Sequence, residues 1–267
     1  MNRRWSFDDL EFSVLWELHV GDRLPTPFIF TTDIEFEDDY QRERVLLRDR
    51  LLACPDPALA EALADCKQPD ISIMVRGFGG SDGRDPAEAV FLRAIRREDR
   101  GYLLTQLPGR TIIHSGGYTI AECPAVRLAE VIADAMPAVP KGTWGRITLP
   151  PDPKSPSEAT EYEPRDSVGG AQLWDSYEEP VEATGRRLLS ITPDRSGEIE
   201  IAQGVSRFGP RGRTVRRLGW RDLPDDGRYV IAPGPPPVAI GVDDAGLIDA
   251  VNAEIIAVVR AIKDERV

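Results

Sequence analysis

Short runs of alternating apolar and polar residues fill the chain from Ile71 to Ile120. Such alternation predicts strands with one buried face. The short turns between the runs predict antiparallel neighbours, because a parallel return needs a long crossover. The predicted strands are 71–76, 90–97, 102–107 and 111–120. Apolar residues at helical spacing follow over 125–136 and stop at Pro137. This region is therefore predicted to be an antiparallel meander closed by a helix.

The same order of elements returns nearer the C-terminus. Strands are predicted at 199–205, 213–220, 228–231 and 238–242, and a helix with apolar residues every three or four positions begins at Asp244. We interpret the repeat as two half-domains related by an approximate twofold axis, with two unrelated meanders as the alternative. The predicted fold class is α+β, with a central, mainly antiparallel sheet of two quasi-twofold related strand meanders and helices packed on it.

The segments around the meanders complete the predicted organisation. Helices are expected from Ser6 as the cap to Gly21, at 38–53, at 55–67 and, as a short helix, at 172–184, whereas the tail after Ile262 is expected to fray. Prolines among acidic and small residues in 150–164 predict a mobile linker at about 150–170. We expect one domain, residues 1–267, with halves 1–149 and 171–267.

The charge and the apolar content limit the classes of partner. A formal net charge of −12 argues against nucleic acid or an anionic membrane surface. No apolar stretch approaches the roughly 20 residues that span a bilayer, and a signal-peptide pattern is missing, so we expect no membrane insertion and a cytoplasmic location. The three cysteines are odd in number and lack CxxC spacing, which favours free thiols in a reducing compartment.

Catalytic and ligand-binding motifs are scarce. The two histidines, His19 and His114, stand apart, and no serine lies in a GxSxG sequence, so neither a zinc site nor a hydrolase site is supported. The glycine-rich stretch 77–83 lacks the third glycine of a dinucleotide loop. The acidic residues from Asp33 lack the glycine and glutamate of a calcium loop. The sequence therefore predicts no catalytic residues, no metal and no cofactor, with an enzyme as the least favoured class.

Arginine residues crowd the second meander of this acidic chain. They are Arg207, Arg211, Arg213, Arg216, Arg217, Arg221 and Arg228. We interpret them as the solvated charges of a sheet edge or as a docking surface for an acidic or amphipathic protein segment. Nucleic acid is less favoured, since no aromatic residues interleave with the arginines. Trp220, in the same region, is either a core residue or an interface anchor.

Four passages, taken in order, carry a resemblance to a known family. They are 15–18 with 24–27, then 70–76, then a helix ending at 136–137 with 142–149, and finally 226–230 between an arginine-rich strand and the last helix. In order and spacing these passages resemble the EspG family, the ESX secretion-associated proteins of actinobacterial type VII secretion. They span nearly the whole chain.

The resemblance implies both a fold and a function. It implies a mixed fold with a central antiparallel sheet, and a cytosolic chaperone without catalysis. Such a chaperone binds the exposed apolar tip of the PPE partner in a PE–PPE helical heterodimer, keeps it soluble and delivers it to a secretion system. We expect this chaperone to be a monomer or a homodimer. The alternative is a non-catalytic adaptor or immunity-like protein that binds another protein through the same sheet.

The resemblance also implies where a client binds. The family uses its sheet face, a loop between early strands and the C-terminal helical part, and the corresponding loop here is 79–84. The residues expected to bind the client are Phe78, Gly79, Arg84, Arg216, Arg217, Trp220 and Tyr229.

Overall fold

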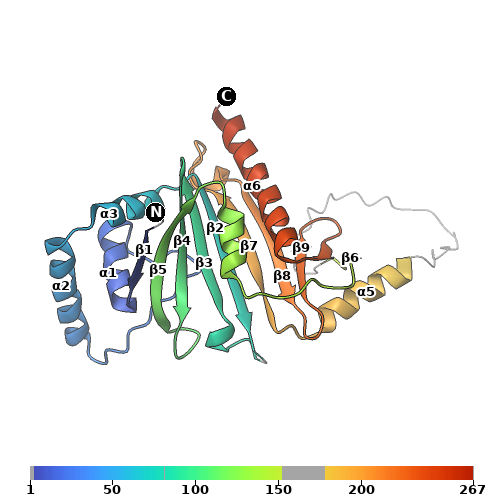
Figure 1. The fold of residues 1–267 in the computed structure, drawn as a ribbon, viewed down its shortest axis with the longest axis horizontal. Helices are drawn as coiled ribbons and strands as arrows, with labels where there is room; N and C mark the ends of the chain where they lie inside the picture. The colour runs from blue at the N-terminus through green and yellow to red at the C-terminus, as the bar shows by residue number, and fades with distance from the viewer. Residues whose placement is uncertain (1–2, 81, 152–177, 267) are drawn as a thin grey trace, which may run out of the picture.

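The computed structural model describes residues 3–80, 82–151 and 178–266 (Figure 1). Their strands form one ten-stranded sheet in the order β1-β5-β4-β3-β2-β7-β8-β9-β10-β6. The strands are β1 (Arg4–Phe7), β2 (Ile71–Gly79), β3 (Val90–Arg97), β4 (Arg100–Pro108), β5 (Ser115–Pro124), β6 (Arg146–Thr148), β7 (Arg195–Gln203), β8 (Val215–Asp222), β9 (Arg228–Ala232) and β10 (Val238–Gly241). The helices are α1 (Asp9–His19), α2 (Glu37–Ala53), α3 (Pro57–Lys67), α4 (Leu128–Ala135), α5 (Glu178–Ser190) and α6 (Asp244–Arg266).

The strand order accounts for the repeated pattern in the sequence. Strands β2–β5 form one meander and β7–β10 the other, and their first strands, β2 and β7, pair antiparallel at the centre of the sheet. A helix lies directly before each meander and another directly after it, and a short strand, β1 or β6, lies at each outer edge. All neighbouring strands are antiparallel. The predicted α+β fold with two quasi-twofold related meanders is confirmed.

The predicted linker divides the chain into two halves. Residues 152–177, which include most of the predicted linker at 150–170, lie outside the described residues. The boundaries of the two halves, 1–149 and 171–267, therefore stay a prediction.

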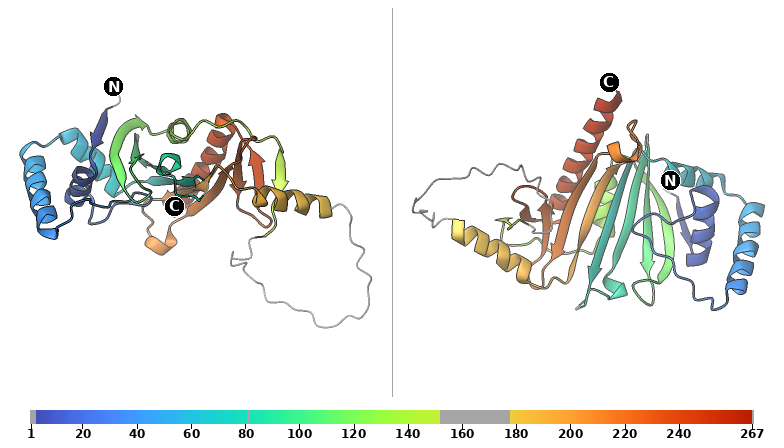
Figure 2. Two further views of the ribbon diagram at one scale, coloured as in Figure 1. Left: turned by 90° about the horizontal axis from the view of Figure 1, so that it is seen from below. Right: turned by 180° about the vertical axis from the view of Figure 1, so that it is seen from behind.

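Helices cover the two faces of the sheet differently (Figure 2). On one face α4 and α6 pack against each other and over a core that includes Ile73 and Ile201 of the central strands. On the opposite face α1 and α3 cover β3–β5 through Phe12 and Leu63, and α5 covers the other end through Leu188. Between them no described helix covers the central strands on this side (Figure 2). We call this uncovered part of the sheet the open face.

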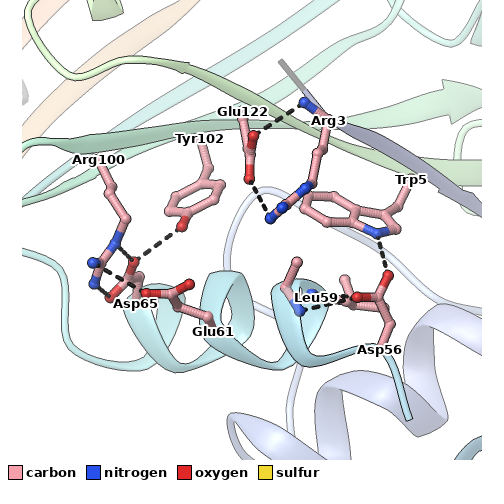
Figure 3. A network of polar contacts seen from close by, with 10 residues as sticks. Arg3, Trp5, Asp56, Leu59, Glu61, Asp65, Arg100, Tyr102 and Glu122 are labelled. Atoms are coloured by element: carbon pink, nitrogen blue, oxygen red, sulfur yellow. Dashed lines mark hydrogen bonds and ion pairs between the residues drawn. The ribbon is translucent and has the colours of Figure 1, made fainter. Parts of the chain in front are cut away.

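Polar contacts hold α3 against the sheet (Figure 3). The carboxylate of Asp65, a residue only 6% exposed, accepts hydrogen bonds from Arg100 Nε at 2.6 Å, from Arg100 Nη2 at 2.9 Å and from the Tyr102 hydroxyl at 3.1 Å. Near the start of the helix, Asp56 accepts a hydrogen bond from Trp5 Nε1 of β1 at 2.8 Å. The Trp5 hydrogen bond is the main reason why the pKa of Asp56 lies below its usual value. Helix α3 is thus tied to both β1 and β4.

In the first half of the chain, the starts of two predicted elements differ from the observed ones. Ser6 lies in β1, and Asp8 caps α1 instead, because its carboxylate accepts a hydrogen bond from the Glu11 N–H at 2.6 Å. Residues 111–114 do not begin a strand; they form a turn in which the His114 N–H donates to the Thr111 carbonyl at 3.0 Å. Strands β1 and β6 escape the sequence prediction, since four and three residues are too few to display alternation.

Further differences lie in the second half. Strand β7 ends at Gln203, so Val205 belongs to a loop, and of the helix predicted at 172–184, residues 172–177 lie outside the described part. Helix α6 does not fray after Ile262 but continues to Arg266, because the Glu265 carboxylate holds the loop between β7 and β8. Within the described ranges, neither α6 nor any other helix is long and apolar enough to cross a membrane.

Buried tyrosines predict a loss of stability at alkaline pH. Desolvation by burial raises the pKa of Tyr118 and of Tyr229 to about 12, and it also raises that of Tyr102. Above about pH 10 the unfolded chain loses these protons while the folded chain keeps them, so the free energy of unfolding should fall as the pH rises from there. Urea unfolding at a series of alkaline pH values measures the slope. Tyr118→Phe should make it shallower, and an unchanged slope would contradict the assignment.

Candidate functional site

The first three residues predicted to bind a client lie at one end of the sheet. Phe78 and Gly79 end β2, next to the start of β7, and Arg84 is exposed in the loop that follows. The last turn of α6 lies at the other end, because Glu265 accepts a hydrogen bond from Gln203, the last residue of β7. The loop at 79–84 and the end of the C-terminal helix therefore do not form one continuous surface.

The neighbouring residues Arg216 and Arg217 point to opposite faces of the sheet. Arg216 Nε donates to the Glu254 carboxylate of α6 at 2.6 Å. Arg217 donates to Glu200 of β7, on the open face, through Nε at 2.9 Å and Nη2 at 2.6 Å. Each guanidinium thus already has a carboxylate partner within the chain.

The two predicted aromatic site residues are buried. Trp220 is 1% exposed and Tyr229 is 0% exposed. The Trp220 ring packs so closely on β2 that a Cβ at Gly77 would lie 2.2 Å from it. The Tyr229 hydroxyl donates to Asp226 at 2.5 Å and accepts from the Trp144 N–H at 3.0 Å. The structure supports the core interpretation of Trp220, and a role of either residue in client binding stays a prediction.

The arginines of the second meander do not form the predicted sheet edge. Strands β8 and β9 are interior, because β10 and β6 lie beyond them. Arg228 is 1% exposed and donates to Asp222 at 2.7 and 2.9 Å, so it belongs to the core. Arg221 donates to the Ile191 carbonyl at 2.6 Å. The arginines are adjacent in sequence but divided in space between the core, both faces and a loop.

The open face carries charges that pair with one another. Arg93 and Glu200 both face Met74 across neighbouring strands, and Arg217 pairs with Glu200. In the next row Arg76 donates to Glu198 at 2.7 Å. Burial lowers the pKa of Arg93, which also donates to a backbone carbonyl at 2.6 Å. An apolar partner on this face would separate paired charges from water, which is costly.

An apolar groove lies on the other face, between α6 and the connection from β5 to α4. Its hollow of about 370 Å³ is lined by Arg96, Ala125, Val126, Leu128, Asn252, Ile255, Ile256, Val259, Arg260 and Lys263. Val126 is 79% exposed and Ile256 is 51% exposed. We call this hollow the basic groove. Exposed apolar side chains that gather in a concave site are typical of a binding surface.

The charged residues that line the basic groove are all cationic. They are Arg96, Arg260 and Lys263, and no carboxylate is among the lining residues. Within the described part of the chain, Arg260 and Lys263 form no hydrogen bond or ion pair, and Arg96 Nε donates to the Glu98 carbonyl at 3.0 Å. The adjoining hollow beyond Val126 is lined by Asp70, Glu98 and Asp99 as well. The cationic side of the groove is therefore the one formed by Arg260 and Lys263, and this side favours an apolar partner with acidic residues beside it.

Sequence reasoning missed this groove. One local signal was present, since Ile255 and Ile256 are consecutive and widen the apolar stripe of α6 beyond a single core-facing row. The other wall comes from Val126, far away in sequence. No local pattern links these positions.

Neither the partly buried thiols nor His114 has the surroundings of a reactive group. All three cysteines are free, and burial raises the pKa of Cys66 to about 12 and of Cys123 to about 11, so both thiols stay protonated at neutral pH. His114 Nδ1 lies 2.6 Å from Thr111 Oγ1, and His114 Nε2 lies 3.4 Å from Asp33. Asp33 is 63% exposed, unlike the buried aspartate of a catalytic triad. The described residues contain no cluster of His, Cys, Asp or Glu suited to a metal ion.

Comparisons with known proteins agree on one family and one fold. A sequence model of the EspG family matches residues 8–251. Among solved structures, the chain is similar to the Mycobacterium tuberculosis type VII secretion system chaperone EspG5, determined in complex with a PE25–PPE41 dimer. The TM-score is 0.52 at 11% identity, over 99% of this chain and 96% of that one, which shows a shared fold. A sequence comparison with curated proteins finds no match.

Proposed function

Because the chain belongs to the EspG family, we propose that it is a chaperone of type VII secretion. It binds the apolar helical tip of a PPE-like client in a PE–PPE heterodimer, keeps the client soluble in the cytoplasm and targets it to its secretion system, without catalysis. The family match over 8–251 and the fold shared with a chaperone solved in complex with PE25–PPE41 support this proposal.

The observation that carries the proposal within the structure is the basic groove. An apolar helix tip in water aggregates, and covering it removes that surface from solvent. The groove supplies Val126, Ile256 and Val259 for this contact, on the rigid support of α4 and α6. A helix laid in a groove, with an apolar centre and a polar rim, is a recurring mode of protein recognition. The groove therefore takes the tip, and the cations on its rim contact polar or acidic residues beside it.

Replacement of Ile256 by glutamate should weaken client capture strongly. The change places a carboxylate in the apolar centre of the groove, where its desolvation costs about 2 kcal/mol or more, or about 30-fold in affinity. The test is co-expression with a PE–PPE pair from the same genome, followed by assay of the soluble fraction and of co-purification. Val45→Glu is the matched control, because Val45 is 56% exposed on α2, away from the groove.

A second variant separates the groove from the sheet face predicted by sequence. Arg217→Glu changes a side chain on the open face that is 62% exposed, so the repulsion from Glu200 is screened by solvent and the variant should stay folded. If Arg217→Glu releases the client and Ile256→Glu does not, the client binds the open face. If the unchanged protein neither solubilises nor co-purifies with the PE–PPE pair, the chaperone function itself is wrong.

A further inference from the structure

The loop between β7 and β8, residues 204–214, combines exposed apolar side chains with arginines. Phe208 is 70% exposed and Val205 is 64% exposed. Arg207, Arg211 and Arg213 lie in the same segment, which we call the arginine loop. Aromatic residues and arginine are the side chains most often responsible for binding energy at protein interfaces.

The arginine loop is held in place by the last turn of α6. The Glu265 carboxylate accepts hydrogen bonds from Ser206 Oγ at 2.9 Å, from Gln203 Nε2 at 3.0 Å and from the Arg207 N–H at 3.2 Å. Within the loop, Ser206 Oγ also accepts from the Phe208 N–H at 3.1 Å. Because the loop is already fixed in this way, it loses little conformational entropy when a partner binds its exposed side chains.

The three guanidinium groups of the loop have no salt bridge to a described carboxylate. Arg207 donates to the backbone carbonyl of Glu265 and lies 5.6 Å from the Phe208 ring centroid. Arg213 Nε donates to the Gln203 carbonyl, and Arg211 has no hydrogen bond or ion pair in the described part. Their neighbours on β8 differ, because Arg216 and Arg217 each pair with a glutamate.

A hollow of about 290 Å³ opens beside the arginine loop. Its lining residues are Gln68, Asp70, Arg97, Gln203, Val205, Arg207, Ile262 and Glu265. Val205 and Ile262 give it an apolar part that suits one aliphatic side chain. It shares no lining residue with the basic groove. A third hollow lies between the two, since it shares Asp70 with this one and Val126 with the basic groove.

From these contacts we infer that the arginine loop is a second docking site, separate from the proposed client groove. Its occupant is an acidic segment of a partner protein that carries an apolar side chain. The carboxylates of this segment pair with Arg207, Arg211 and Arg213. Its apolar side chain packs against Val205 and Ile262 in the hollow, and Phe208 adds an exposed aromatic contact beside it. Charge complementarity decides the choice of partner, because the loop is a local cationic site on a chain whose net charge of −12 repels nucleic acid.

The test is a fluorescence-polarisation titration of the full chain with a fluorescein-labelled peptide of repeated Glu-Asp-Leu. The peptide should bind, and binding should weaken as salt is added. Arg211→Glu and Phe208→Ala should each lower the affinity about tenfold or more. Arg48→Glu is the matched control, since Arg48 is exposed on α2 and its replacement changes the net charge by the same amount as Arg211→Glu. This variant should bind the peptide with unchanged affinity.

Three outcomes would overturn the inference. They are equal affinity of the Arg211→Glu variant, equal affinity for a peptide in which Lys replaces Glu and Asp, and binding of phosphatidylglycerol vesicles without binding of the peptide. The proposed chaperone function is tested independently, because Arg211→Glu should still co-purify with the PE–PPE pair. Loss of the pair from this variant alone would mean that the arginine loop belongs to the client site.

Discussion

Replacement of Asp222 by alanine is expected to lower the free energy of unfolding by about 3–5 kcal/mol. Asp222 ends β8 and Arg228 begins β9, and each side chain is only 2% exposed. Arg228 Nε and Nη2 donate to the two carboxylate oxygens at 2.7 and 2.9 Å. Removing the carboxylate leaves the Arg228 guanidinium buried beside the Trp220 ring without its counter-charge. The free energy spent on taking this cation out of water is then no longer offset by the ion pair. Urea unfolding followed by tryptophan fluorescence measures the loss.

Two controls separate the buried charge from a general loss of contacts. Asp39 pairs with Arg42 on α2, where both side chains are largely exposed, so Asp39→Ala should change stability by less than about 1 kcal/mol. The double variant Asp222→Leu with Arg228→Met replaces the ion pair by apolar groups and should recover much of the stability lost in Asp222→Ala. A double variant as unstable as Asp222→Ala would show that the buried unpaired charge is not the cause.

The role of Arg228 illustrates how far the sequence leads. Alternation places 228–231 in a strand, as observed, because a strand pattern depends only on residues two positions apart. The same local information groups Arg228 with Arg216 and Arg217 as one charged surface. Position in the fold separates them, since Arg216 meets a glutamate 38 residues away and Arg228 points into the core. Whether an arginine is exposed or buried therefore depends on a partner that is distant in sequence, and local pattern does not identify that partner.

The candidate binding surfaces follow the same logic. The strands of the two meanders and the helices α4 and α6 are predicted from periodicity, apart from shifts at their ends, whereas the short edge strands β1 and β6 are not. The basic groove forms only when Val126 and Ile256, each unremarkable in its own segment, are brought to opposite walls. The arginine loop is held by Glu265, which lies 59 residues after Ser206. The sequence predicts that this end of the chain frays, but in the structure it is helical and binds the loop. The basic groove is a product of tertiary packing that no local pattern predicts. The crowding of arginines does suggest a docking surface for an acidic segment, but it does not separate the arginines that pair with a carboxylate from those of the arginine loop.

Replacement of Asp65 by alanine is expected to lower the free energy of unfolding by about 2–3 kcal/mol. The side chain accepts hydrogen bonds from Arg100 and Tyr102, which tie α3 to β4 (Figure 3). The cost is smaller than at Asp222, because the side chain of Arg100 is 41% exposed and still pairs with Glu61 at 3.2 Å. What the variant leaves unpaired is the Tyr102 hydroxyl, in a residue that is 2% exposed.

Glu61 and Tyr102 provide the controls for this prediction. Glu61 lies one turn before Asp65 on α3 and contacts the same arginine, but its side chain is 56% exposed, so Glu61→Ala should cost less than about 1 kcal/mol. In the double variant of Asp65→Ala with Tyr102→Phe, both partners of the buried hydrogen bond are absent. Its loss of stability should therefore be clearly smaller than the sum of the two single losses. Strict additivity would mean that Asp65 stabilises the fold through Arg100 alone and that the bond to Tyr102 contributes nothing to the attachment of α3.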